Sequence, residues 1–297
     1  MADRYSKDTA QQRTYRAFEA LITEEDAAID LAQASLLIAS IAYPSLDSTH
    51  YLAQLDALAR RVRAALALPN PDLLPQLPDS TDPLSVIEAI NQVLFAEEHF
   101  HGNEDDYHNP DNSFLNIVLE QHIGIPISLS IIYMEVGRRV GMQIDGIGLP
   151  MHFVIRCHFT EGYIYIDPFH NGRLLTEQDC VALLRRIAGG RVKLNTSWFK
   201  PLTHRALLKR VLNNLKSVYI DTEDFEHALT ICDLLVLLSP HNPIELRDRG
   251  ILHFELKHYA HALHDLKAYT QLAPQAKDHD EILDHIKTIR QTIAMMN

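Results

Sequence analysis

Apolar residues recur at helical spacing through the N-terminal third of the chain. They form two stripes, Leu31, Ala34, Ser35, Ile38 and Ile41, followed by Leu52, Leu55, Leu58, Ala59 and Val62. Side chains that recur every three or four residues lie on one face of a helix. The stripes are separated at Tyr43-Pro44, because proline disfavours helix in the residue before it. A further helix is predicted over residues 82–100, where Asp82 can cap the first turn and Pro83 takes its first position.

The middle of the chain changes from helical spacing to alternation. A helix is predicted from Pro126 to Gly141, since its apolar positions keep helical spacing and glycine is typical of a left-handed C-cap. Residues 144–149, 153–159 and 163–166 then alternate as strands do.

Two polar residues lie at the ends of the predicted hairpin. His152 comes before its first strand and Asp167 ends its second, so folding of the hairpin is predicted to bring them into contact. Alternation places Cys157 on the face opposite His152, which makes this thiol a poor nucleophile for that imidazole.

The C-terminal part contains an internal repeat with a period of 34 residues. Glu226-His227-Ala228-Leu229 recurs as Ala260-His261-Ala262-Leu263, and Leu238-Ser239-Pro240 as Leu272-Ala273-Pro274. This period and pattern resemble the tetratricopeptide repeat, a helical hairpin that stacks on its neighbours. We expect two repeats and a capping helix over residues 201–297, with residues 1–200 as a separate domain. The histidines of this region are predicted to be surface residues: His253, His258, His261, His264 and His279.

Composition excludes several classes of protein. A net charge of −12 over 297 residues argues against binding to a phosphate backbone, and no run is apolar enough for a signal peptide or a membrane span. The three distant cysteines Cys157, Cys180 and Cys232 are typical of free thiols in a reducing compartment. We therefore expect a cytoplasmic protein with no nucleic-acid or membrane partner and no cofactor.

A helix start that faces a histidine and an aspartate is the arrangement of many thiol acyl-transfer enzymes. The nucleophile belongs at the helix start, the base on one strand and the carboxylate behind the base. Here the helix start holds Pro126, Ser128 and Ser130 but no cysteine. Ser128 is therefore a candidate nucleophile for His152, although small serines at a tight helix start also bond back to the backbone.

The polar segment 100–113 offers a different chemistry. His101, Asp105 and Asp106, together with His152, could form a metal-dependent site, but their spacing matches no known ligand motif, so no metal is assigned. The segment also suits an ordered loop beside the pocket. The residues expected to line that pocket come from this loop and from the helices that follow it: Asn103, Asp105, Asp106, Asn112, Asn116, Pro126 and Ser130.

Long motifs across the chain carry a family resemblance. GNEDDYHNPDNSFLNIVLE, GIPISLSIIYMEVGRRVG, LPMHFVIR and IDPFHNGRLLTEQDC resemble bacterial transglutaminase-like proteins with C-terminal tetratricopeptide repeats. The resemblance implies an α+β, largely helical fold with a papain-like core, an N-terminal helical region and a C-terminal helical hairpin array. It also implies that His152 is the base and Asp167 its orienting carboxylate. Active members have Gly-x-Cys before the helix, whereas this chain has Gly124-Ile125-Pro126.

Three functions remain open at this point. The first is a non-catalytic or weakly catalytic protein whose pocket binds a ligand and whose repeats dock a protein or peptide partner. The second is an amide hydrolase or acyltransferase that uses Ser128, His152 and Asp167. The third is a metal-dependent activity built on the 99–108 loop.

Overall fold

The structure is a computed structural model that describes residues 10–68, 77–78, 80–159, 162–190 and 195–296. It divides into two compact units. One contains Thr23–Val211, and the other contains the chain up to Ile22 and from Leu212 onward, so the first helix is grouped with the C-terminal helices. The predicted assignment of residues 1–200 and 201–297 to separate domains stays a prediction.

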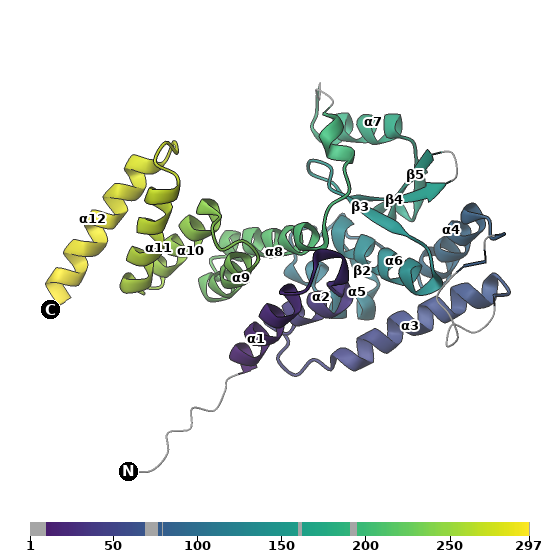
Figure 1. Cartoon of the computed structure of the whole chain (residues 1–297), viewed down its shortest axis with the longest axis horizontal. Helices are drawn as coiled ribbons and strands as arrows, with labels where there is room; N and C mark the ends of the chain where they lie inside the picture. Colours follow the sequence, from purple (N-terminus) through teal and green to yellow (C-terminus); the bar gives the residue numbers. More distant parts are fainter. Residues whose placement is uncertain (1–9, 69–76, 79, 160–161, 191–194, 297) are drawn as a thin grey trace, which may run out of the picture. The chain divides into compact units, whose positions relative to one another are not determined.

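Helices form one side of the unit Thr23–Val211 (Figure 1). They are α2 (Leu31–Ala39), α3 (Ser48–Ala65), α4 (Pro83–Asn91), α5 (Leu115–Gln121) and α6 (Pro126–Val140), with short 3₁₀ turns η1 (Asp26–Ala28) and η4 (Pro110–Ser113) between them. The predicted helix over residues 82–100 differs in its last part, because Gln92–Glu97 form the π-helix η3. Its wider turn places both Glu97 and Glu98 against the guanidinium of Arg61.

Helix α6 lies at the centre of this unit. Nearly all of its residues are buried, including the polar Ser128, Ser130 and Glu135. A helix that is apolar around most of its circumference must be covered on all sides. Accordingly α6 packs against α2, α3, α4 and α5 as well as the sheet. It ends at Gly141 with a φ of 104°, the left-handed C-cap that the sequence predicts.

A four-stranded antiparallel sheet covers α6. Its strands, in spatial order, are β3 (Ile144–Ile147), β4 (Val154–Phe159), β5 (Gly162–Asp167) and β6 (Arg173–Leu175). The sheet lies between α6 on one face and α7 (Glu177–Ile187) on the other (Figure 1). Val154 and Tyr165 join the apolar cluster under α7, while the alternate residues of β4 point toward α6. Ile155 pairs with Ile166, and this register sets the ends of the hairpin side by side.

A short parallel pair connects the polar loop to the start of α6. In it β1 (His101–Gly102) lies beside β2 (Ile123–Gly124), and the amide of Asn103 donates to the carbonyl of Gly124 at 2.9 Å. The loop is thereby held next to the helix start. The turn η5 (Pro168–His170) after β5 packs against β1 and α6.

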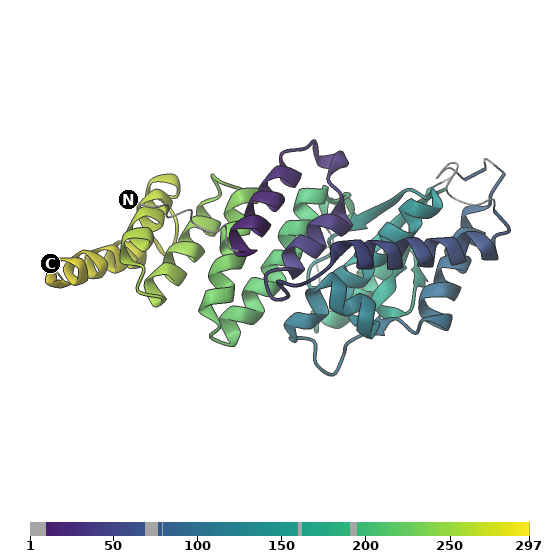
Figure 2. The same ribbon diagram turned by 90° about the horizontal axis from the view of Figure 1, so that it is seen from below.

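The C-terminal helices form successive antiparallel neighbours. After the turn η6 (Thr196–Phe199), the helices are α8 (His204–Asp221), α9 (Phe225–Leu238), α10 (Pro243–Glu255), α11 (Tyr259–Leu272) and α12 (His279–Met296), and α1 (Ala10–Ile22) packs against α9. Figure 2 shows α9 to α12 one after another. Gly250 permits the close approach of α10 and α11, because a Cβ there would lie 2.8 Å from the Leu266 side chain. Helix α12 covers the apolar residues of α11.

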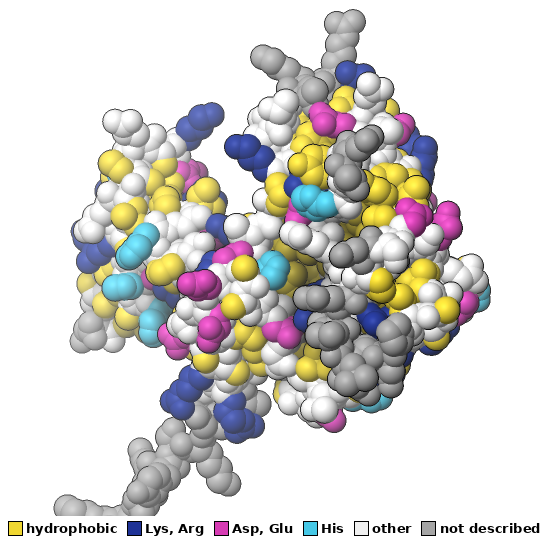
Figure 3. Space-filling model, turned by 45° about the vertical axis from the view of Figure 1, so that its right-hand side comes forward, with side chains coloured by type: hydrophobic (Ala, Val, Ile, Leu, Met, Phe, Trp, Pro, Cys, Tyr) yellow, Lys and Arg dark blue, Asp and Glu magenta, His cyan; other side chains and the backbone are white. Residues whose placement is uncertain are grey.

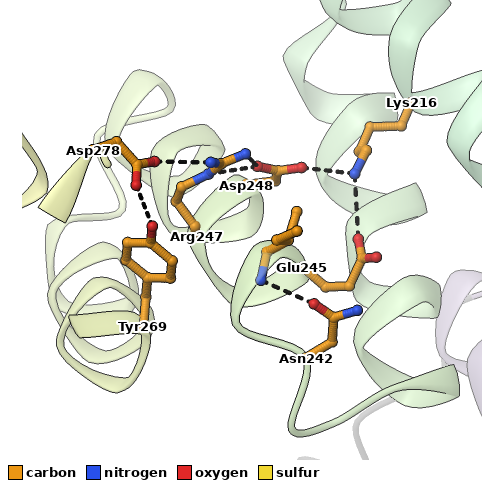
Figure 4. A network of polar contacts seen from close by, with 8 residues as sticks. Lys216, Asn242, Glu245, Arg247, Asp248, Tyr269 and Asp278 are labelled. Carbon is orange, nitrogen blue, oxygen red and sulfur yellow. Dashed lines mark hydrogen bonds and ion pairs between the residues drawn. The ribbon is translucent and has the colours of Figure 1, made fainter. Parts of the chain in front are cut away.

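A chain of charges links these helices (Figure 4). Lys216 donates to Asp248 at 2.7 Å and to Glu245 at 3.2 Å. Arg247 bridges Asp248 and Asp278 at 2.7 and 2.8 Å. These ion pairs connect α8 and α10 with Asp278, the residue before α12.

Candidate functional site

His152 is positioned by the turn that precedes β4. Its imidazole is buried, and its backbone amide donates to Leu149 at 3.3 Å. The guanidinium of Arg210 donates to the carbonyl oxygens of both His152 and Leu149, at 2.7 and 2.8 Å. Arg210 also lies over the Phe153 ring. Burial lowers the pKa of Arg210. Its guanidinium holds the backbone at His152 in place through the two hydrogen bonds to the carbonyl oxygens.

Asp167 ends β5 and accepts hydrogen bonds from two imidazoles. Its Oδ2 lies 3.0 Å from Nε2 of His152 and 2.7 Å from Nδ1 of His170, while its Oδ1 accepts the Phe169 amide at 3.2 Å. The predicted contact between His152 and Asp167 is therefore present. Burial alone would raise the pKa of Asp167, but the bonds from His152 and His170 outweigh it and hold the pKa at about 2.

His170 is a member of the site that the sequence reasoning missed. Asp167 caps the turn η5, and this turn brings the third residue after the cap back onto the carboxylate. The hydrogen bond to Asp167 raises the pKa of His170 despite partial burial of the ring. The run Asp-Pro-Phe-His carried the signal, because a capping aspartate before proline predicts such a turn.

The Ser128 hydroxyl forms its hydrogen bonds with the nearby backbone. Its hydroxyl donates toward the carbonyl of Asn112 at 2.6 Å, lies 3.1 Å from the carbonyl of Ile125, and accepts the Ile125 amide at 3.0 Å. All three partners belong to the loop and helix start, and none is His152. Ser130 is fully buried, and its hydroxyl has no partner among the described residues.

The predicted pocket residues of the loop mainly hold one another. Asn103 donates to the side chain of Asn112 at 3.0 Å and accepts the Asp106 amide at 2.9 Å, while Asn112 donates to the Asp106 carbonyl at 2.7 Å. The loop does lie beside the site, because Gly102 packs closely on Phe169 and the ring of Tyr107 meets that of Phe169 at 6.2 Å.

The remaining members of the predicted set differ in exposure. Asp105 is exposed, Asn116 is buried in α5, and Pro126 is the first residue of α6. Their pocket-lining role stays a prediction.

None of the three thiols is a usable nucleophile. Cys157, Cys180 and Cys232 are buried, and burial raises the pKa of each to about 12. A thiol with such a pKa is almost entirely protonated at neutral pH, whereas the thiolate is the reactive form.

The described residues contain one cluster of three metal-ligating side chains. It consists of His152, Asp167 and His170, whose nearest ligand atoms all lie within 4.8 Å of one another. The metal hypothesis based on the 99–108 loop named a different set, and among described residues the loop forms no such group. Of that earlier set only His152 takes part.

Two family models match consecutive parts of the chain. Residues 49–213 match the transglutaminase-like superfamily, and residues 215–287 match the tetratricopeptide repeat. The chain belongs to the transglutaminase-like superfamily. The predicted resemblance is confirmed, and so is the α+β, largely helical fold class.

Three similar proteins place the chain among its relatives. The UPF0162 protein of Xylella fastidiosa (strain Temecula1) is 35% identical over 269 residues, which cover 90% of this chain and 92% of that protein. Human F-box only protein 21 is 33% identical over 141 residues, 45% of this chain and 22% of that protein. The crystal structure of menin is 12% identical with a TM-score of 0.40 over 92% of this chain and 73% of that one, a likeness too weak to define the fold.

The matched transglutaminase-like region contains the whole His152–Asp167–His170 cluster and the start of α6. The resemblance places the family's cysteine at the position of Pro126, the first residue of that helix. Proline fits there because the first helical amide has no intrahelical partner. The first residue of α6 therefore presents an apolar ring and no nucleophile.

Two further observations concern the surface. No helix within the described ranges has both the length and the apolar character needed to cross a bilayer. Histidine side chains reach the surface of the C-terminal helices (Figure 3), where His258, His261 and His264 are exposed. His253 and His279, by contrast, are half-buried. Burial lowers the pKa of His253 to about 4.

Proposed function

We propose that this protein is a binding protein built on a transglutaminase-like core that has lost covalent catalysis. In this proposal the site at His152 and Asp167 binds a segment of a polypeptide ligand, and the tetratricopeptide repeats dock a protein partner. One observation carries the proposal: the base is present and oriented, but no nucleophile among the described side chains is hydrogen-bonded to it. An oriented imidazole without a neighbouring hydroxyl or thiol can bind and polarise a ligand but cannot activate a serine or cysteine to form an acyl-enzyme.

The bonds of Ser128 oppose its use as a nucleophile. An alcohol depends on a direct hydrogen bond to the base, because its own pKa is too high for a helix dipole to activate it. Turning the hydroxyl toward His152 would break its bond to the Asn112 carbonyl and leave buried groups unpaired. Each such group costs about 1–3 kcal/mol. The hydroxyl therefore acts as a structural cap.

The C-terminal repeats supply the second half of the proposal. Tetratricopeptide arrays stack helical hairpins into surfaces that bind peptides. The charge chain from Lys216 to Asp278 supports this role, since it connects the helices on which such a surface depends.

A turnover assay tests the loss of catalysis. Wild-type protein, His152→Gln and Ser128→Ala are assayed against p-nitrophenyl esters, peptide p-nitroanilides and amine incorporation into casein, with folding checked by thermal melting. The proposal expects no turnover above buffer for any of the three. Turnover by the wild type that His152→Gln abolishes would overturn it, and loss in folded Ser128→Ala as well would establish the serine hydrolase instead.

The cluster of His152, Asp167 and His170 favours one alternative. Two imidazoles and a carboxylate with a position left for water are a common ligand set for a catalytic Zn²⁺ or Fe²⁺ ion. In that case protein dialysed against Zn²⁺ or Fe²⁺ would retain one metal per chain by elemental analysis, and His170→Gln would lose it. Metal content at background in both proteins excludes the alternative.

A further inference from the structure

A small cavity borders the site at Asp167 and His170. Its volume is about 230 Å³, and its walls come from η5, β6 and α7. The charged residues that line it are Asp167, His170, Arg173, Asp179 and Arg186, over an apolar floor that includes Leu175 and Leu183. A cavity of this volume is large enough for a small anionic group.

The carboxylates in the cavity have their main acceptors already in use. Asp167 accepts from His152 and His170 through one oxygen and from the Phe169 amide through the other. Asp179 caps α7, where its Oδ2 accepts the amide of Thr176 at 2.9 Å and the hydroxyl at 2.7 Å. Each carboxylate therefore already accepts hydrogen bonds from groups of the protein itself.

The guanidinium groups of Arg173 and Arg186 at the cavity differ from these carboxylates. Within the described part of the chain, neither Arg173 nor Arg186 has a hydrogen-bond or ion-pair partner, and both are exposed at the cavity. The pKa of Asp179 is lowered mainly by its hydrogen bonds from Thr176 and to a smaller extent by the charge of Arg173, while the charge of Arg186 opposes the rise in the pKa of His170 that the bond to Asp167 causes. The cavity therefore offers ten guanidinium N–H donors and few free acceptors.

We propose that this cavity binds an oxyanion, a carboxylate or a phosphate, carried by the polypeptide ligand that the His152 pocket holds. The inference rests on the proposed function, since Asp167 forms a wall shared by the cavity and the His152 site. Arginine is suited to this task, because its planar fork donates two parallel bonds to a carboxylate or phosphate. The ligand class is thereby narrowed to an acidic or phosphorylated segment.

Calorimetric titration of the full chain tests the oxyanion site. The probes are N-acetyl-aspartate amide for the carboxylate and phenyl phosphate for the phosphate, each in 150 mM sodium chloride. We expect saturable binding of at least one probe, and the tighter one identifies the source. Arg173→Gln and Arg186→Gln should each weaken it at least ten-fold. Arg185→Gln is the matched control, because Arg185 is exposed on the same helix but does not line the cavity.

The outcomes separate this inference from the proposed function. Absence of saturable binding by both probes overturns the oxyanion site, and so does an equal loss in Arg185→Gln, which would indicate unspecific charge attraction. Either result leaves the turnover assay untouched. Conversely, turnover that depends on His152 would overturn the loss of catalysis without affecting probe binding, which is expected to persist in His152→Gln.

Discussion

At the scale of single residues, the site is organised by the carboxylate of Asp167. It is buried, and its Oδ2 is hydrogen-bonded to two imidazoles, those of His152 and His170. A buried charge is tolerated only where hydrogen bonds and opposite charges offset its desolvation. The two histidines provide that compensation, so the same contact that orients the His152 imidazole also helps to keep the aspartate ionised.

Replacement of this carboxylate should cost stability at neutral pH. The pKa of Asp167 is about 2 in the folded protein and 3.8 ordinarily, a depression that corresponds to about 2 kcal/mol. A depressed pKa stabilises the fold above the ordinary value, and the contribution is lost as the pH falls through the folded-state value. Asp167→Asn should therefore lower the free energy of unfolding by about 2 kcal/mol at pH 7, and the difference should shrink below pH 4. Urea titrations from pH 3 to 7 measure this, with the exposed Asp105→Asn as a control that changes little.

His170 should show the opposite pH dependence. Its hydrogen bond to Asp167 raises its pKa above the ordinary 6.5, so its contribution is complete below pH 6.5 and is lost as the pH rises through the folded-state pKa. His170→Gln should thus lower the melting temperature more at pH 5.5 than at pH 9. An equal loss at both pH values would mean that the imidazolium makes no special contribution.

At the scale of elements, the start of α6 offers a matched pair of serines. The Ser128 hydroxyl makes three bonds to the backbone, whereas the Ser130 hydroxyl is buried with no partner among the described residues. Ser128→Ala should cost about 1–3 kcal/mol, since it leaves buried backbone groups unpaired. Ser130→Ala should be neutral or stabilising, because it removes a buried polar group that gains nothing from its position. Differential scanning calorimetry of both variants decides, and equal losses would contradict the assigned role of Ser128.

The pair α10 and α11 depends on a buried ion pair. Arg249 donates to both oxygens of Asp265, at 2.6 and 3.0 Å, and Asp265 is 2% exposed. Arg249→Met should cost about 3–5 kcal/mol, because it leaves a buried charge uncompensated. Lys287→Met removes the fully exposed pair with Asp284 and should leave stability almost unchanged, because solvent screens such a pair. Chemical unfolding of the two variants compares them, and similar small losses would show that the buried pair is replaceable.

At the scale of the whole molecule, local patterns predicted most elements, the contact between His152 and Asp167, and the C-terminal repeats. The hairpin placed His152 beside Asp167 because register in an antiparallel pair follows from a short connection. The 34-residue period predicted the repeats, since each repeat must bury its apolar face on its neighbour.

Contacts between residues far apart in the sequence could not be predicted from local patterns. Arg210 donates a hydrogen bond to the backbone of His152, which lies 58 residues earlier in the sequence. Helix α1 packs against α9, although most of the sequence lies between them. No local period encodes either contact. The π-helix η3 also lacks a sequence signal, because its residues have ordinary helical spacing and the ion pairs of Arg61 involve a different helix.

The central claim, that the oriented base has no nucleophile, is tested most directly by intact-mass spectrometry after treatment with a fluorophosphonate. This reagent labels serines that a neighbouring histidine activates, so it reports activation independently of any substrate. The account predicts an unmodified mass for the wild type, equal to that of His152→Gln. A single adduct that maps to Ser128 and disappears in His152→Gln would contradict it.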